Sequence, residues 1–469
     1  MADEAAGTEI LSLGEFPPTP TAEWEAAIRA DLKGADYEKK LVWRTEEGLA
    51  VRPYYRREDV GFAADEPAPG EFPFVRGTAK AAISAQAIVL PQSAIRADEW
   101  HEAGAHAVQE LAWAMAAGIE RIDQRTAGQS AGDAARAVEF VFAAGPQYFV
   151  EIAKFRAARL LWARVVEAFE PGSPEAARMQ LYVRTSRRNK SIYDPYSNLL
   201  RATTEALSAV IGGCDSLQVE AFGFDPHLAD NVQHVLREEA HMGEVADPSG
   251  GSYYIEALTD ALARAAWKAL QEIEAAGGYS AAVKSGALEK ALAETRTARE
   301  KAVALRRRTL VGVNNYPDLH EKTQAAEASP DTPRLAIPFE RIRARTARHA
   351  AATGRYPKLL LLERGDVKMR GARANFMLNC FGCAGFDIEQ SSEYKGSDAD
   401  LIALCSSDPE YLALAREVCP AVKTPVIVAG NPKDQIEELK QAGVAGFVHV
   451  ASDAVATLTE WQDRLGMKE

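Results

Sequence analysis

Short apolar runs alternate with amphipathic stretches through the middle of the chain. The runs are rich in Leu, Ile and Val, and the stretches between them repeat apolar residues at helical spacing. Strands that are apolar on both faces and separated by helices are typical of a parallel sheet covered by helices. The pattern predicts strands at 83–90, 181–183 and 216–219, and helices at 103–118, 146–169, 198–211 and 227–241.

A second alternating unit opens at Lys358. Its strands and helices follow one another in the order expected of a doubly wound, flavodoxin-like sheet. The predicted strands are 359–362, 401–404, 426–428 and 446–448, and the predicted helices are 371–382, 409–418, 433–442 and 454–465.

The remaining segments suggest four regions. A helix signal at Thr21 and short strands within 41–51 precede the first alternating unit, and a long helical pattern from Leu258 to about Arg308 follows it. The predicted domains are an N-terminal arm with short strands (1–79), a first α/β domain (80–255), a helical linker region (256–354) and a C-terminal α/β domain (355–469).

Charge and composition exclude several classes of partner. The chain has 54 basic and 67 acidic side chains and a net charge of −13, which argues against nucleic acid and anionic membranes as partners. No apolar run reaches the ~20 residues that span a bilayer. Residues 1–14 are acidic and unlike a signal peptide, and five cysteines suit a reducing compartment, so we expect a cytoplasmic protein.

Four segments carry a resemblance to a known family. They are Tyr-Asp-Pro-Tyr-Ser-Asn-Leu-Leu-Arg (193–201), Ile-Gly-Gly-Cys-Asp-Ser-Leu (211–217), Asp-Pro-Ser-Gly-Gly-Ser-Tyr-Tyr (247–254) and Val-Gly-Val-Asn-Asn-Tyr (311–316). With these segments, the chain from Thr21 to Leu465 resembles the adenosylcobalamin-dependent methylmalonyl-CoA mutases, minus an internal stretch, and the loop at 100–105 is similar to that of their small, non-catalytic subunit. The resemblance implies a TIM-type (β/α) barrel followed by a cobalamin-binding-type, flavodoxin-like domain.

The first α/β domain is too short for a complete barrel. A (β/α)₈ barrel needs ~250 residues, and the segment from Lys80 to Ile255 offers far fewer, with three or four strands of the barrel type. We therefore expect a partial, four-stranded barrel that lacks the family's first four strands. Its two open strand edges need a cover, and the strands at 41–51, a second copy or a large subunit are the candidates.

The resemblance also locates the family's cofactor site. Catalytic members carry Asp-x-His-x-x-Gly, whose histidine ligates cobalt. The aligned residues here are Asp366, Lys368 and Gly371, and an ammonium group has no lone pair to offer a metal. Two later cofactor elements are also altered, at 405–407 and 429–430. The family implies adenosylcobalamin, but this chain is not expected to bind it through a histidine.

The residues that match the substrate-binding positions of catalytic members also differ from those members. The histidine that catalytic members present to the thioester falls at Glu99, and a carboxylate there would repel the developing negative charge. The neighbouring His101 suits a packing role better than acid–base chemistry. Glu102 and Glu239 match glutamates that lie near the adenosyl ribose in the family, although surface carboxylates are an equal alternative. Arg188 replaces a family polar residue.

A Cys-x-x-Cys pair, Cys380 and Cys383, raises the question of redox or metal chemistry. A zinc site would need two further ligands at suitable spacing, and the remaining cysteines do not form a second such pair. The pair follows an apolar helix, so packed thiols are the preferred interpretation.

These features predict a small-subunit-type component of methylmalonyl-CoA mutase. The complex would interconvert methylmalonyl-CoA and succinyl-CoA, and acyl-CoA would reach this chain only through the complex. Its partner would be a large catalytic subunit or a second copy, and its own role structural or regulatory. Two alternatives remain: an active acyl-CoA mutase that binds cobalamin without the histidine, and a free-standing, decayed paralogue that acts as a binding module.

Overall fold

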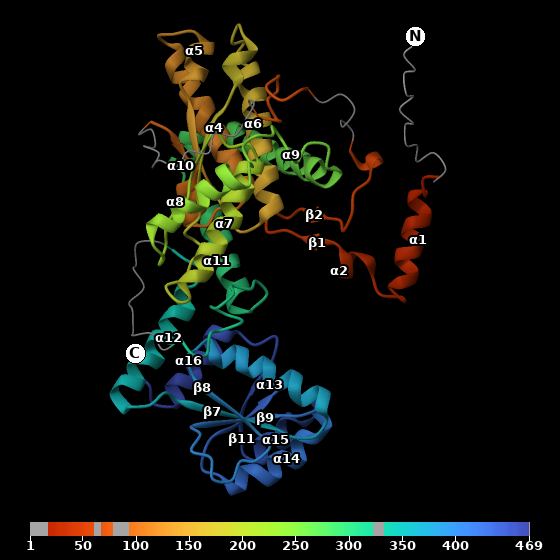
Figure 1. The fold of residues 1–469 in the computed structure, drawn as a ribbon, viewed down its shortest axis with the longest axis vertical. Helices are drawn as coiled ribbons and strands as arrows, with labels where there is room; N and C mark the ends of the chain where they lie inside the picture. The colour runs from red at the N-terminus through yellow and green to blue at the C-terminus, as the bar shows by residue number, and fades with distance from the viewer. Residues whose placement is uncertain (1–16, 61–66, 78–92, 322–332, 469) are drawn as a thin grey trace, which may run out of the picture. The chain divides into compact units, whose positions relative to one another are not determined.

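The computed structural model describes residues 17–60, 67–77, 93–321 and 333–468. The chain divides into two compact units that meet between Arg56 and Arg57. The short strands predicted within 41–51 pair with each other in antiparallel fashion (Figure 1). The first unit contains α1 (Thr21–Asp31), α2 (Tyr37–Leu41), β1 (Trp43–Arg44) and β2 (Ala50–Val51).

The first sheet of the second unit has four parallel strands in sequential order. Sequential parallel strands with helical crossovers are the arrangement of a TIM-type barrel, so the predicted α/β class with a partial barrel is confirmed, while a closed barrel is not. The predicted strand 83–90 lies outside the described residues. The strands are β3 (Ile95–Arg96), β4 (Glu139–Ala144), β5 (Gln180–Thr185) and β6 (Ser216–Gln218).

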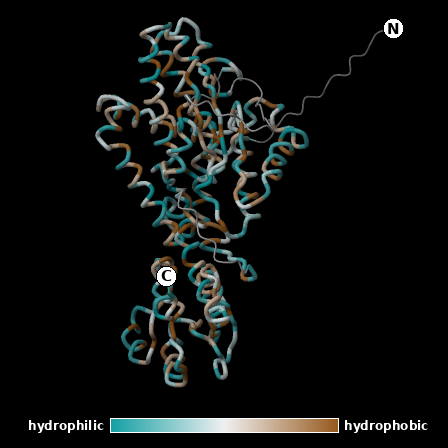
Figure 2. Tube along the Cα trace, turned by 90° about the vertical axis from the view of Figure 1, so that its left-hand side faces the viewer, coloured by the Kyte–Doolittle hydropathy of each residue, from teal (hydrophilic) through white to brown (hydrophobic). Residues whose placement is uncertain are grey.

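Eleven helical segments surround or follow this sheet in the described part of the chain. Hydrophilic and hydrophobic residues are interspersed along the helical turns of the chain (Figure 2). They are α3 (Ala97–Ala103), α4 (Ala107–Thr126), α5 (Ala131–Arg136), α6 (Tyr148–Glu167), η2 (Pro174–Ala177), α7 (Pro195–Ile211), α8 (Pro226–His234), η3 (Val235–Glu239, a single π turn), α9 (Tyr253–Ala275), α10 (Tyr279–Lys284) and α11 (Ala287–Ala304); the short η1 (Arg57–Asp59) precedes them.

The predicted helix 103–118 was wrong at both ends. Gly104, at φ +120°, separates α3 from α4, and α4 continues past Gly118 to Thr126. Gly118 lies against a side chain of the core, because a Cβ there would come within 2.5 Å of the Trp162 ring. Gly118 is therefore an interior residue of α4 that allows close packing, and it does not mark the end of the helix. The single helical pattern at 258–308 is likewise broken into α9, α10 and α11.

The two faces of the first sheet differ in character. Phe140 of β4 packs edge-on against Trp162 of α6 with ring centroids 4.8 Å apart, so helices cover this face. The strand register places Arg96, Tyr182 and Arg184 on the opposite face. The interior of a closed TIM barrel is filled with branched apolar side chains, and this charged face is not built in that way.

The C-terminal sheet is parallel with the order β11-β10-β9-β7-β8, which is the flavodoxin-like order predicted from the sequence. Its strands are β7 (Lys358–Glu363), β8 (Asp387–Ser391), β9 (Leu401–Cys405), β10 (Val426–Ala429) and β11 (Val444–Val448). The accompanying helices are α12 (Ile337–Thr353), α13 (Val367–Gly382), η4 (Asp408–Glu410), α14 (Tyr411–Val418), η5 (Cys419–Ala421), η6 (Lys433–Gln435), α15 (Ile436–Gln441) and α16 (Ala454–Arg464).

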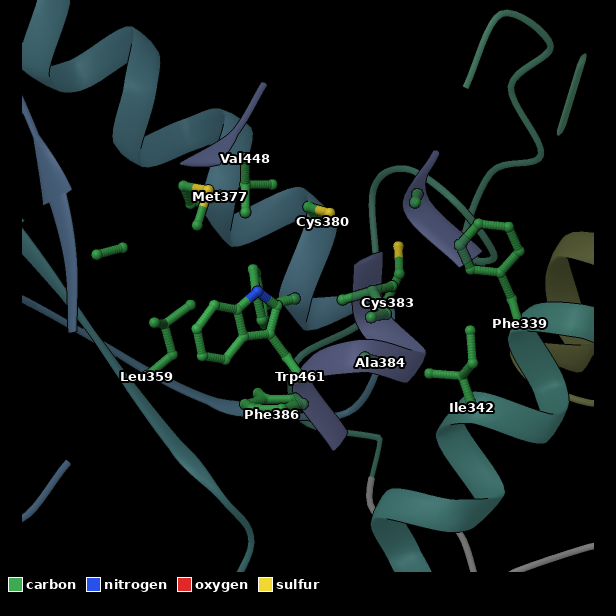
Figure 3. Packing of buried hydrophobic residues seen from close by; sticks show 14 of the residues in the cluster. Phe339, Ile342, Leu359, Met377, Cys380, Cys383, Ala384, Phe386, Val448 and Trp461 are labelled. Carbon is green, nitrogen blue, oxygen red and sulfur yellow. The ribbon is translucent and has the colours of Figure 1, made fainter. Parts of the chain in front are cut away.

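Alternate residues of these strands enter two different cores. Leu359 and Leu361 belong to a cluster with residues of α12, α13 and α16, whereas Leu360 and Leu362 belong to a cluster with residues of α14 and α15. In the first cluster the Trp461 indole lies close to Leu359 (Figure 3). The period of two along a strand thus explains why each strand reads as one continuous apolar run.

Candidate functional site

A buried polar cluster lies at the carboxyl ends of the first sheet's strands. His101 Nδ1 lies 2.7 Å from Glu110 Oε1, and His101 Nε2 lies 3.0 Å from the hydroxyl of Ser186, which follows β5. Lys154 donates to Glu110 Oε2 at 2.9 Å and to the carbonyl of Ala143 at 2.7 Å. The cluster therefore ties α3, α4 and α6 to the ends of β4 and β5.

The Ser186–His101–Glu110 array resembles the hydrogen-bonding order of a hydrolase triad. Ser186 is completely buried, and its hydroxyl oxygen also accepts a hydrogen bond from the backbone N–H of Arg188 at 3.0 Å. A nucleophile must meet its substrate, and this hydroxyl has no exposed surface. The array holds the loop after β5 in place, which agrees with the packing role expected for His101.

The charge of Glu110 makes part of the stability dependent on pH. Burial disfavours its charge, but Lys154 and His101 outweigh burial and lower its pKa to about 2, against an ordinary value of 4.5. Because the folded-state pKa is the lower one, the stabilisation is present above pH 4.5 and is lost as the pH falls toward 2. We expect Glu110→Gln to cost about 3 kcal/mol at pH 7 and progressively less at acid pH, as measured by urea unfolding across this range. A cost that does not change with pH would contradict this assignment.

Glu102 lies at the same edge, where a partner is present for one of its two carboxylate oxygens, while Oε2 is buried without a hydrogen-bond partner among the described residues. One carboxylate oxygen accepts a hydrogen bond from the backbone N–H of Arg187 at 2.8 Å. The Arg188 guanidinium donates to the Glu102 carbonyl at 3.2 Å and to the Pro333 carbonyl at 2.7 Å. Burial, aided by Arg299, lowers the pKa of Arg188 to about 10. These contacts bring the segment before α12 onto the end of β5.

The other predicted residues of the substrate side lie apart from this cluster. Glu239 is exposed at the end of the π turn η3. Glu99 is exposed and forms an ion pair with Arg96 at 3.2 Å. Glu99 lines a pocket with Arg96 and Trp100, and neither Glu102 nor Glu239 lines that pocket.

The C-terminal sheet has its candidate site at the carboxyl end of β7. Asp366 caps α13 by accepting a hydrogen bond from the Met369 N–H at 2.8 Å. Lys368 and Gly371 lie in the first two turns of α13, where both are exposed, and a Cβ on Gly371 would meet no atom within 4 Å. The three residues share one loop and helix start, as the motif spacing predicted.

Glu410 bridges the crevice at which ligands of such sheets bind. Strand order reverses between β7 and β9, and ligands of open α/β sheets lie outside the strand ends at this switch point. Glu410 is the last residue of η4, which follows β9, and its Oε2 accepts hydrogen bonds from the Ser406 hydroxyl at 2.7 Å, the Ser407 hydroxyl at 2.5 Å and the Asp366 N–H at 3.1 Å. Hydrogen bonds from Ser407, Ser406 and the backbone lower its pKa to about 2. A ligand phosphate would meet a carboxylate here.

Tyr411 fills the neighbouring space between the ends of β9 and β10. Its side chain is fully buried, and its hydroxyl donates to the Ala429 carbonyl at 2.7 Å and accepts from the Ser406 N–H at 3.4 Å. Sequence reasoning missed both Glu410 and Tyr411. Their only signal was their position directly after the altered element at 405–407.

Comparison with known proteins assigns the family. The methylmalonyl-CoA mutase family profile matches residues 84–352. The small subunit of this mutase from Porphyromonas gingivalis is 30% identical over 613 aligned positions, which cover 97% of this chain and 98% of that protein. This chain belongs to the methylmalonyl-CoA mutase family. The small subunit from Streptomyces virginiae is 36% identical over 398 positions, and the mutase from Rhizobium meliloti is 40% identical over 224.

The family members differ from this chain in extent. The alignment with the Porphyromonas gingivalis subunit is longer than the 469 residues of this chain, so stretches of that protein have no counterpart here. The chain spans 63% of the length of the Streptomyces virginiae subunit. It is a small-subunit-type member of the mutase family, as its sequence predicted.

The residues at the C-terminal edge do not fit the family's cobalamin. Lysine stands where catalytic members place the ligating histidine, the switch point carries the Glu410 carboxylate, and Tyr411 takes up the space beside it. Within the described ranges, no group of three or more His, Cys, Asp or Glu side chains is placed to hold a metal ion.

The cysteines of the Cys-x-x-Cys pair are core residues. Cys380 and Cys383 lie among apolar side chains such as Met377 and Phe386 (Figure 3). Burial raises the pKa of Cys380 to about 11 and raises that of Cys383 further. A buried, protonated thiol is a poor nucleophile, which supports the packed-thiol interpretation.

Thiol labelling separates this interpretation from a redox role. Of the five cysteines, Cys419 alone is not fully buried, so one thiol of the native chain is expected to react readily with a disulfide reagent and all five after unfolding. Cys419→Ser should remove the fast-reacting thiol. Rapid labelling of Cys380 or Cys383 in the native protein would contradict the packing assignment.

Proposed function

We propose that this chain is the non-catalytic small subunit of a heterodimeric methylmalonyl-CoA mutase. The complex would interconvert methylmalonyl-CoA and succinyl-CoA, with the cofactor and the reacting acyl group held by the large subunit. The similar proteins named as small subunits support this assignment. The contribution of this chain would be structural or regulatory.

The observation that carries the proposal is the residue set at the end of β7. An exposed ammonium, Lys368, stands in the ligand position, and the Glu410 carboxylate bridges the adjacent crevice. Neither group supplies what a corrinoid with a displaced base requires, namely a neutral nitrogen ligand below the metal. Asp366, Lys368, Gly371, Glu102 and Glu239 are in this proposal remnants of the family's cofactor positions.

We also propose four regions along the chain and a cytoplasmic location. The first α/β domain would be 80–255, the helical linker 256–354 and the cobalamin-binding-like domain 355–469, with an arm at 1–79. Five free cysteines support a cytoplasmic location. In the part of the chain that the structure describes, no helix combines the length and apolar character needed to cross a membrane.

Association with a large subunit tests the proposal. We expect the full chain, co-expressed with a large mutase subunit that carries an intact Asp-x-His-x-x-Gly, to co-purify as a one-to-one complex by light scattering. Size-exclusion profiles in which the two proteins elute separately would refute the heterodimer and favour a free-standing binding module.

A further inference from the structure

A groove with a basic rim runs between α12 and α16. It has a volume of about 460 Å³ and is lined by three arginines of α12, Arg341, Arg345 and Arg348. Positions i, i+4 and i+7 of a helix share one face, so the arginines form a row about 10 Å long. In a chain with a net charge of −13, a row of three cations on one helix face is a local reversal of charge.

Two of these arginines have no partner in the described structure. Arg341 and Arg348 are exposed and make no hydrogen bond or ion pair with any described residue. Arg345 is buried, and its terminal nitrogen donates to Asp463 and to the Met467 carbonyl, each at 2.6 Å. Asp463 is thus already paired, and the outer two cations remain available to an anion.

The groove also contains buried polar atoms that lack partners. Arg345 Nε and Gln462 Oε1 are inaccessible to solvent and have no hydrogen-bond partner among the described residues. Both side chains line the groove. A buried donor or acceptor without a partner costs free energy. Solvent reaches neither atom, so an occupant of the groove does not meet them as the side chains stand, and they do not select its chemistry.

The floor of the groove is apolar. Ile342 is 4% exposed and Val455 is partly buried, and both pack in the first core cluster of the C-terminal sheet. An occupant that matches the groove therefore has carboxylates along one side and an aliphatic side chain toward the floor. A protein segment that carries both acidic and aliphatic residues provides both.

We propose that the α12–α16 groove is a docking site for an acidic segment of the large mutase subunit. The inference rests on the proposed function and adds the surface through which the partner is held. Carboxylates of that segment pair with Arg341 and Arg348, and an aliphatic residue contacts Ile342 and Val455. Contacts between rim charges are screened by salt, so the association weakens as salt concentration rises.

Titration of the full chain with the purified large subunit tests this surface. R341E/R348E is expected to bind at least about tenfold more weakly than wild type and to lose most of the salt dependence. The matched control K423E/K433E makes the same change in net charge at two exposed lysines of the C-terminal domain and should bind within about twofold of wild type. Thr459→Trp places a large side chain in the groove without a change of charge and should also weaken binding. Far-UV circular dichroism and Tm verify that each variant is folded.

The outcomes separate this inference from the proposed function. Wild-type affinity in both R341E/R348E and T459W overturns the docking site while the heterodimer stands. Equal losses in R341E/R348E and in the lysine control indicate general charge repulsion and also overturn it. In a separate titration with pyrophosphate, binding by wild type that R341E/R348E loses, together with retained affinity for the large subunit, would make the groove a small-anion site and overturn the docking role. Failure of the wild-type chain to bind the large subunit overturns the proposed function itself.

Discussion

Replacement of Arg156 by leucine is expected to destabilise the folded chain by about 3–5 kcal/mol. Arg156 is 1% exposed, and its guanidinium pairs with Glu256 through two hydrogen bonds of 2.7 Å and also with Asp247. The Asp247 carboxylate takes a further hydrogen bond from Arg76 at 3.0 Å, and Glu256 takes one from the Gly251 N–H at 2.9 Å. The substitution would leave two buried carboxylates short of positive charge.

The stability is expected to fall because Arg156 holds the turn at residues 247–251 in place. The Asp-Pro-Ser-Gly-Gly segment is a turn in which Asp247 and Gly251 have φ of +46° and +80°. The Arg156 side chain fixes this turn to α6 and to the start of α9. Urea unfolding followed by circular dichroism gives the change in free energy, and hydrogen exchange in α6 and α9 shows whether the loss is local.

An exposed pair of the same kind is the control for Arg156. Arg264 bonds Asp260 at 2.7 Å with its side chain 78% exposed, and Arg264→Leu should leave the unfolding free energy nearly unchanged. A loss below about 1 kcal/mol for Arg156→Leu, or equal losses for the two variants, would contradict the anchoring role.

Replacement of Lys190 by methionine should be similarly damaging. The Lys190 ammonium lies 2.6 and 2.7 Å from the two oxygens of Glu205, and both side chains are 0% exposed. Burial lowers the pKa of Lys190 and raises that of Glu205, so burial disfavours both charges in spite of their attraction. Removal of Lys190 alone leaves the Glu205 charge buried with a hydrogen bond from Asn189 and the more distant charge of Arg201, at a cost of about 3–5 kcal/mol.

A double-mutant cycle tests the reasoning behind this second prediction. If desolvation offsets most of the pair's attraction, Lys190→Met combined with Glu205→Leu should recover most of the stability lost in either single variant. Unfolding free energies of the four proteins provide the coupling energy. A double variant as unstable as the sum of the two single variants would show that the pair is not coupled.

Local signals were sufficient for most of the fold, and their failures have physical causes. Leu359–Leu362 is apolar because both of its faces are buried, so the run identified a central strand. The edge strand β8, Asp387–Ser391, is mostly half-buried and polar, and it carried no such signal. The strand β4, Glu139–Ala144, has the same kind of continuous apolar run as the predicted strands, but it was not identified from the sequence.

The sequence likewise located some residues of the candidate sites but could not predict the contacts between residues far apart in the chain. Lys368 could be located because its motif is contiguous in sequence. The bridge from Glu410 to the Asp366 N–H joins residues 44 positions apart, and the contact of His101 with Ser186 spans 85. No spacing rule predicts such pairs, since their approach depends on the strand order of each sheet.

The central claim is that this chain does not perform the mutase reaction by itself. The most direct test is an isomerisation assay of the purified chain, with adenosylcobalamin and methylmalonyl-CoA supplied, in the absence and in the presence of the large subunit. We predict no succinyl-CoA from this chain alone and turnover once the large subunit is added. Measurable succinyl-CoA formation by the isolated chain would contradict the account.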